Sequence, residues 1–108
     1  MSVLDIEKVD GIALDGEYIR LFLSDHLEWN DEYEHLLILQ NKINAYIAFC
    51  ENEQFNQVYP NRIIKYAIFE IHFKYEPTVK AMDFLEQVQR QLNEIGITIE
   101  CHMSEVTK

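Results

Sequence analysis

The apolar and polar residues of this chain alternate with a period that changes several times, and each change marks an expected element of secondary structure. Two alternating stretches, from about Lys8 to Leu14 and from Tyr18 to Asp25, flank the dipeptide Asp15-Gly16. Because Asp-Gly readily adopts the positive φ angles of a tight primed turn, this segment is predicted to be a β-hairpin. The residues of its second strand that should face the core are Ile19, Leu21 and Leu23.

A helical period follows the hairpin. Asn30 is a suitable N-cap, and the acidic residues after it complement the positive end of a helix dipole. The helix should run to about Glu53. An apolar stripe at a spacing of three and four residues must meet the sheet; it consists of Leu36, Leu39, Ile43, Tyr46, Ile47 and Cys50.

The second half of the chain predicts one more strand, one more helix and a last strand. Alternation from Ile63 to Tyr75 is typical of a long strand. Pro77 fits the first turn of a helix that ends at Gly96, a residue suited to the left-handed position after a helix. The stripe of this helix should be Ala81, Leu85, Val88, Leu92 and Ile95. The strictly alternating run from Ile97 to Met103 is expected to be the last strand.

The predicted order is therefore ββαβαβ, and the fold class is α+β. Strands with one buried face and two amphipathic helices predict a two-layer α/β sandwich, a four-stranded mixed sheet with both helices on one face. Right-handed crossovers would make the last three strands mutually parallel, with the first strand antiparallel to the second. The strand order stays open. Residues 1–108 are expected to form a single domain, with residues 103–108 as a frayed tail.

The first helix carries a second apolar strip on the side away from the stripe described above. Ile38, Ala45 and Phe49 lie on it, at 100° per residue. A helix face open to water rarely carries such residues. Either the second helix or the loop from Glu53 to Pro60 covers the strip, or the strip is the interface of a homodimer.

The face of the sheet opposite the helices is expected to be mixed and rich in aromatic residues. It should carry Tyr18, Arg20, Phe22, Ile68, Glu70, His72, Thr98, Glu100 and His102. Such a face could be solvated, could pair with a second sheet, or could hold a partner, because aromatic and Arg side chains are favoured at interfaces.

The charge of the chain narrows the classes of partner. The formal net charge is −10 and the isoelectric point is about 4.7. That balance argues against nucleic acid and against anionic membranes as partners, because both need a basic patch. Residues 1–34 contain ten acidic and two basic residues, so −8 of the total charge lies there. The uneven charge could steer a basic protein partner, or it could serve solubility alone.

The two cysteines, Cys50 and Cys101, are expected to be reduced thiols, as in a cytoplasmic protein. The N-terminus has neither the basic nor the apolar region of a secretory signal.

The densest polar cluster, Asp25, His26 and Glu28 with His35 following, lies between the hairpin and the first helix. Carboxylates beside a histidine could bind a divalent metal or form an acid–base pair. The alternative is a capping turn in which Asp25 or Asn30 bonds free helix amides and Trp29 forms an apolar lid.

A second candidate depends on strand order. His72 and His102 each lie two residues from a glutamate, Glu70 and Glu100. If their strands are neighbours, the four side chains could form a metal site on the open face. The alternative is that they are ordinary exposed strand residues. The chain has no nucleophile elbow, P-loop or dinucleotide fingerprint, so catalysis is disfavoured and no cofactor is expected.

Two segments carry a resemblance to a known family. Ser24 to Trp29 and His35 to Phe49 resemble the SDHLxW turn and the HLLxLQxKINAYxxF helix of a small bacterial family of unknown function. The resemblance spans nearly the whole chain and implies no catalytic residue. Genes of this family are sometimes found near bacterial toxin systems, so the resemblance implies an immunity or toxin-neutralising role.

The hypothesis that these observations favour is a non-enzymatic, acidic, cytoplasmic interaction domain. Its expected partners are a second copy of the chain and a basic protein. One alternative is a small enzyme or metal-binding protein that uses Asp25, His26 and Glu28, or His72 and His102. The other is a nucleic-acid mimic, whose carboxylates would have to be spaced like phosphates.

Overall fold

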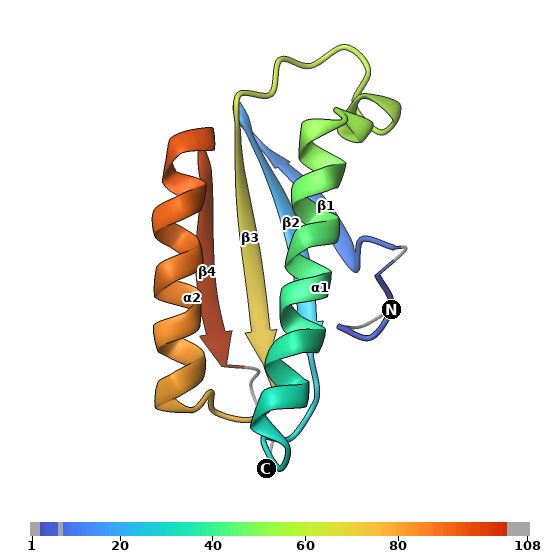
Figure 1. The fold of residues 1–108 in the computed structure, drawn as a ribbon. Coiled ribbons are helices and arrows are strands. Elements are labelled where there is room, and N and C mark those ends of the chain that lie inside the picture. The colour runs from blue at the N-terminus through green and yellow to red at the C-terminus, as the bar shows by residue number, and fades with distance from the viewer. Residues whose placement is uncertain (1–2, 7, 104–108) are drawn as a thin grey trace.

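The computed structural model describes residues 3–6 and 8–103. Four strands, two helices and two short 3-10 helices follow one another along the chain (Figure 1). In chain order they are β1 (Gly11–Asp15), β2 (Tyr18–Asp25), α1 (Glu32–Glu51), η1 (Gln54–Gln57), β3 (Tyr66–Phe73), α2 (Val79–Leu92), η2 (Asn93–Ile95) and β4 (Ile97–Met103). The predicted ββαβαβ order is confirmed. Residues 104–108, which belong to the predicted tail, lie outside the described residues.

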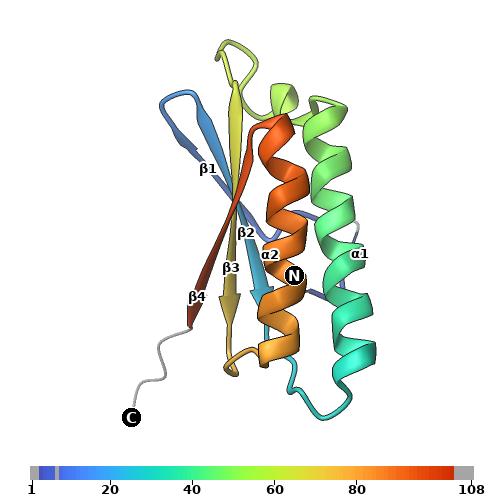
Figure 2. The same cartoon turned by 60° about the vertical axis from the view of Figure 1, so that its left-hand side comes forward.

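The four strands form one mixed sheet in the order β1-β2-β3-β4. β1 and β2 are antiparallel, whereas β2, β3 and β4 are mutually parallel, as expected from the crossovers. Both helices lie on the same face of this sheet (Figure 2), which confirms the predicted two-layer sandwich. The strand order, which the sequence left open, places each strand beside its nearest neighbours along the chain.

The core lies between the sheet and the helices. The predicted inward residues of β2, Ile19, Leu21 and Leu23, are fully buried. The sheet also contributes Phe69 and Ile71 from β3. The helices contribute Leu39, Ile43, Tyr46, Ala81, Leu85 and Leu92. Alternation with a period of two therefore separates a buried face of the sheet from the face that the helices leave open.

The helix starts differ from those predicted. The N-cap of α1 is Asp31 rather than Asn30, because the Asp31 carboxylate accepts from the Glu34 amide at 3.1 Å. The N-cap of α2 is Thr78, whose hydroxyl accepts from the Ala81 amide. Pro77 was predicted in the first turn of α2 but precedes the cap, so its missing N–H lies outside the helix.

The end of α2 also departs from the prediction. The α-helix stops at Leu92 and continues as the tighter turn η2, which turns Ile95 away from the stripe, and this residue is half exposed. Gly96 then takes a left-handed φ of 76°, as expected for the residue after a helix.

The N-terminal segment packs beside the second apolar strip of α1. Val3 is buried, and its amide donates to the Ser24 carbonyl at 2.9 Å. Ile38 and Phe49 are partly buried against the core. Ala45 and Phe49 line a cavity of about 250 Å³ together with Ile6, Lys8, Val9, Tyr46, Ala48 and Gln54. The N-terminal segment, which neither sequence alternative named, therefore lies beside the strip together with Gln54 of the Glu53–Pro60 loop, which the first alternative did name. The homodimer interface at Ile38, Ala45 and Phe49 stays a prediction.

Candidate functional site on the open face of the sheet

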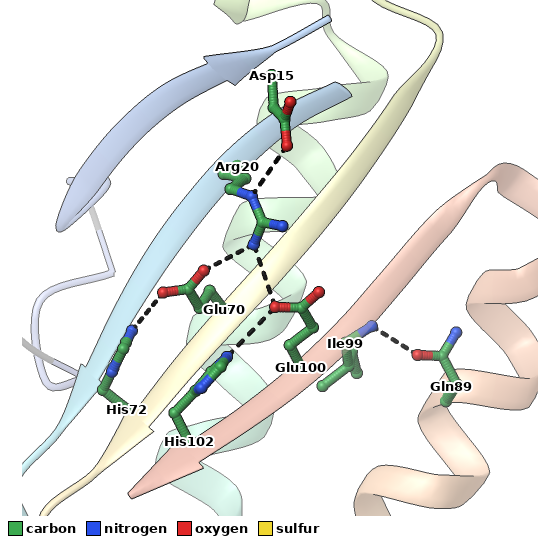
Figure 3. Close-up of polar contacts among 8 residues, drawn as sticks. All are labelled: Asp15, Arg20, Glu70, His72, Gln89, Ile99, Glu100 and His102. Atoms are coloured by element: carbon green, nitrogen blue, oxygen red, sulfur yellow. Dashed lines mark hydrogen bonds and ion pairs between the residues drawn. The ribbon is translucent and has the colours of Figure 1, made fainter. Parts of the chain in front are cut away.

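Alternate side chains of β2, β3 and β4 point away from the helices and define the open face. The strand register pairs Glu70 with Glu100 and His72 with His102 directly across β3 and β4. Arg20 on β2 contacts both glutamates and also Asp15 at the end of β1 (Figure 3). We name these six residues the open-face cluster: Asp15, Arg20, Glu70, His72, Glu100 and His102.

Arg20 bridges the two glutamates at the centre of this cluster. Its Nη1 lies 2.7 Å from Glu70 Oε1 and 3.1 Å from Glu100 Oε1, while its Nε lies 3.6 Å from Asp15 Oδ2. The hydrogen bond to Glu100 raises the pKa of the Arg20 guanidinium. The same bond, followed by that of His102, holds the pKa of Glu100 below its usual value. Charged hydrogen bonds therefore keep the carboxylate ionised and the side chains aligned.

The two histidines extend the cluster toward the end of the strands. His72 Nε2 lies 2.6 Å from Glu70 Oε2, and His102 Nε2 lies 3.2 Å from Glu100 Oε1. Their rings stack with centroids 5.0 Å apart and planes inclined by 17°. Because an ionised carboxylate only accepts hydrogen bonds, each Nε2 carries the proton in this arrangement. Each imidazole is thus oriented by the glutamate two residues before it.

Solvent reaches the cluster more easily toward β4. The Glu70 side chain is 15% exposed and that of His102 is 45% exposed. Ile68, on the same face, is only 7% exposed and pairs in register with Arg20 and Thr98. Long polar side chains therefore shield the apolar centre of the open face while their charged ends stay accessible. The cluster can donate and accept hydrogen bonds and can offer carboxylate and imidazole ligands to a cation.

The polar cluster predicted between β2 and α1 divides into a buried pair and two exposed residues. His35 Nε2 lies 2.6 Å from Asp25 Oδ2, and its Nδ1–H donates to the Glu28 carbonyl at 3.1 Å. Trp29 stacks on the His35 ring at 3.6 Å. His26 and the Glu28 side chain are exposed, so the structure does not bring the four predicted residues together. The pair fixes the turn before α1 and is closed to substrates, since His35 is 3% exposed.

A third polar group was missed by the sequence reasoning. Lys42 is fully buried on α1, and its ammonium donates to Asp10 Oδ1 at 3.0 Å, to the Lys8 carbonyl at 2.7 Å and to the Asp5 carbonyl. Asp10 Oδ2 accepts from the Ser24 amide at 2.8 Å. The available signal was the position of Lys42, three residues after Leu39 and four before Tyr46, within the buried stripe. The hydrogen bonds and the ion pair of Lys42 therefore hold the N-terminal segment against α1.

The fold and the cluster together define a class: a two-layer α+β sandwich whose sheet carries a charged cluster on the side that the helices leave open. Within the described residues, neither helix has the length and apolarity to cross a membrane. The chain belongs to the family of unknown function DUF6572, whose family model matches residues 1–105. The resemblance to an uncharacterised family is thereby confirmed. No curated protein and no solved structure matches the chain.

Proposed function

We propose that this protein is a binding module for a basic protein and that the open face of its sheet is the binding surface. The observation that carries the proposal is the parallel arrangement of β2, β3 and β4 beneath an uncovered face. Parallel strands are normally covered by other elements on both faces, whereas antiparallel sheets tolerate one solvated face. A partner would supply the second layer that the described residues do not provide.

The side chains of this face suit a protein partner. Tyr18 and Tyr66 lie side by side with ring centroids 5.0 Å apart, and they are 41% and 44% exposed. Arg20 and the two histidines of the open-face cluster lie on the same side of the sheet. Aromatic residues and Arg are enriched at the centres of interfaces, where they contribute most of the binding energy. Apolar rings beside oriented charges therefore favour a specific partner.

The charge of the face indicates the sign of the partner. Three carboxylates of the open-face cluster surround the single guanidinium of Arg20. The whole chain carries −10, and Asp15 is the acidic residue of its strongly acidic stretch 1–34 that belongs to the open-face cluster, since Asp10 and Asp25 are paired with Lys42 and His35. A negative field around the open face attracts a basic partner and accelerates its association. An immunity or toxin-neutralising role in the cytoplasm fits a small acidic module of this kind.

The β4 edge of the sheet is less suited to partner binding than the open face. On β4, the Gln89 side chain of α2 accepts from the Ile99 amide (Figure 3). It also donates to the Ile97 carbonyl. These contacts occupy backbone groups that an added strand would need. The partner is thus expected to lie across the face rather than to extend the sheet at this part of β4.

The test compares two variants that remove equal charge. Glu70→Gln/Glu100→Gln removes two carboxylates from the open face, and Glu86→Gln/Glu94→Gln removes two exposed carboxylates near α2. Immobilised wild-type chain and both variants are used to capture proteins from native lysate at low and high salt. The captured protein is then purified, and its affinity for each chain is measured by titration calorimetry.

We expect a basic protein to bind the wild-type chain and the Glu86→Gln/Glu94→Gln control, with affinity that falls as salt rises. The Glu70→Gln/Glu100→Gln variant should bind it more weakly. Capture of no protein at low salt, or equal affinity of the two variants, would contradict the proposal.

A further inference from the structure

The open-face cluster contains metal-ligand atoms that already converge. One ligand atom from each of Glu70, Glu100 and His102 lies within 4.8 Å of the other two. His72 lies next to this group, with its Nε2 at 2.6 Å from Glu70 Oε2 and its ring stacked on that of His102. Because the residues face each other on paired strands, the sheet register holds them together rather than a mobile loop. Sites built on strands are positioned more accurately than sites on loops.

The type of ligand indicates the class of ion. Imidazole nitrogens suit zinc, copper, iron and nickel, whereas magnesium and calcium prefer oxygen ligands alone. Two imidazoles with two carboxylates match the four-coordinate sites that zinc forms. The cluster therefore favours a divalent transition metal over magnesium or calcium.

Arg20 does not block the position facing the histidines. Its guanidinium is directed at Oε1 of Glu70, whereas Oε2 of the same carboxylate faces His72. Hydrogen bonds to the outer oxygen of a ligating carboxylate are typical of metal sites and orient the inner oxygen. At Glu100, Arg20 and His102 share Oε1, at 3.1 and 3.2 Å, so Oε2 is the oxygen that Arg20 leaves to an ion. Arg20 can thus hold both glutamates through Oε1 while Oε2 of each contacts an ion.

The charge of the cluster also favours a dication. Asp15, Glu70 and Glu100 contribute three negative charges, and Arg20 contributes one positive charge. With neutral imidazoles two negative charges remain, which one divalent ion would cancel. A bound cation is often the largest local charge in its site, so such an ion would dominate the electrostatics of the cluster.

We propose that the open face binds one divalent transition metal ion, with Zn²⁺ as the best match, through the converging ligand atoms of Glu70, Glu100 and His102, with the neighbouring His72 as the fourth ligand. When the ion is bound, each ligating imidazole nitrogen gives up its hydrogen bond to glutamate, and the proton of the ring lies on the other nitrogen. The face is exposed, so an ion enters directly from solvent. The proposal does not depend on a protein partner, because the purified chain alone supplies all four ligands.

The test is a calorimetric titration of the chelator-stripped, desalted chain with Zn²⁺, repeated with Mg²⁺. We expect one Zn²⁺ per chain and no binding of Mg²⁺. The variant His72→Ala/His102→Ala should lose about 100-fold or more in Zn²⁺ affinity, because the loss of even an outer-sphere partner costs about 10–100-fold. His26→Ala removes an exposed histidine outside the cluster and should bind Zn²⁺ like the wild-type chain.

Two controls keep the outcome decisive. Circular dichroism in the presence of chelator establishes that the variants fold, and Glu100→Gln, which preserves the shape of its side chain, should also weaken Zn²⁺ binding. Co²⁺ bound to the wild-type chain should give the visible absorption of a site with nitrogen and oxygen ligands.

Absence of Zn²⁺ binding by the wild-type chain, or equal binding by His72→Ala/His102→Ala, would overturn the metal proposal. Neither result would affect the capture experiment above.

Discussion

Replacement of Lys42 by Met tests whether the buried ammonium holds the N-terminal segment on α1. Methionine fills a similar volume but removes the donor that binds Asp10 and the carbonyls of Asp5 and Lys8. The Asp10 side chain is only 3% exposed, so its carboxylate would lose its cation without gaining water. The variant should therefore be destabilised and the N-terminal segment should loosen.

The magnitude follows from the burial of both partners. Removing one member of a buried ion pair costs about 3–5 kcal/mol, because the remaining charge stays uncompensated. A domain of this size is stable by about 5–15 kcal/mol, so Lys42→Met should remove a large part of its free energy of unfolding. The double variant Lys42→Met/Asp10→Asn removes the orphaned charge and should recover part of the loss, since replacing both partners is often nearly neutral.

The assay is urea unfolding followed by circular dichroism, with the slope m compared among variants to establish that only stability changes. Lys65→Met is the matched control, because Lys65 pairs with Glu17 at 3.5 Å and both side chains are more than half exposed. It should cost about 0–1 kcal/mol. Equal losses for Lys42→Met and Lys65→Met would refute the reasoning, as would a double variant less stable than Lys42→Met alone.

Three further predictions concern single side chains. Tyr46→Phe removes a hydroxyl bonded to the Phe22 carbonyl and the Asp10 amide and should cost about 1–3 kcal/mol in urea unfolding. Burial raises the pKa of the Tyr46 hydroxyl, so above about pH 10 this hydroxyl loses its proton in the unfolded chain but not in the folded one. The stability of the wild-type chain should therefore fall as the pH rises above about 10. Tyr46→Phe, which has no such proton, should lack that part of the fall. The pKa of Glu100 is lower in the folded chain than its usual value, so this carboxylate stabilises the fold above about pH 4.5, and the contribution is lost as the pH falls through the pKa of the folded state. The stability of Glu100→Gln should therefore depend slightly less on pH in acid unfolding. An unchanged curve would contradict this. Burial raises the pKa of both thiols, that of Cys50 to about 11, but Cys101 is exposed whereas Cys50 is half-buried. A thiol reagent should therefore modify Cys101 first, and Cys101→Ser should remove the fast phase; a fast phase that persists would disagree.

The secondary structure was predictable because its signals are local. Asp15-Gly16 marks the hairpin; Gly16 takes a positive φ of 63°, whereas Asp15 does not and is the last residue of β1. The alternation in β3 separated Phe69 and Ile71 from Glu70 and His72 before any partner strand was known. Each of these signals depends on neighbours within a few residues, so the chain alone reveals it.

The polar groups were harder to predict because they join distant segments. The pairing of His72 with His102 depends on β3 and β4 being neighbours, which alternation alone does not determine. Lys42 and Asp10 are separated by 32 residues, and nothing near either residue identifies its partner. The sequence offered Trp29 as an apolar lid of the turn before α1, but it did not identify His35 as the ring that Trp29 covers or Asp25 as its buried partner. Contacts between distant residues therefore required the folded structure.

The central claim, that the partner binds the open face, is tested most directly by hydroxyl-radical footprinting of the chain alone and in its purified complex. Exposed tyrosines report on opposite sides of the molecule: Tyr18 and Tyr66 lie on the open face, and Tyr33 lies on α1. The account predicts that the complex protects Tyr18, Tyr66 and the cluster histidines from oxidation while Tyr33 stays reactive. Protection of Tyr33 with Tyr18 and Tyr66 unchanged would contradict it.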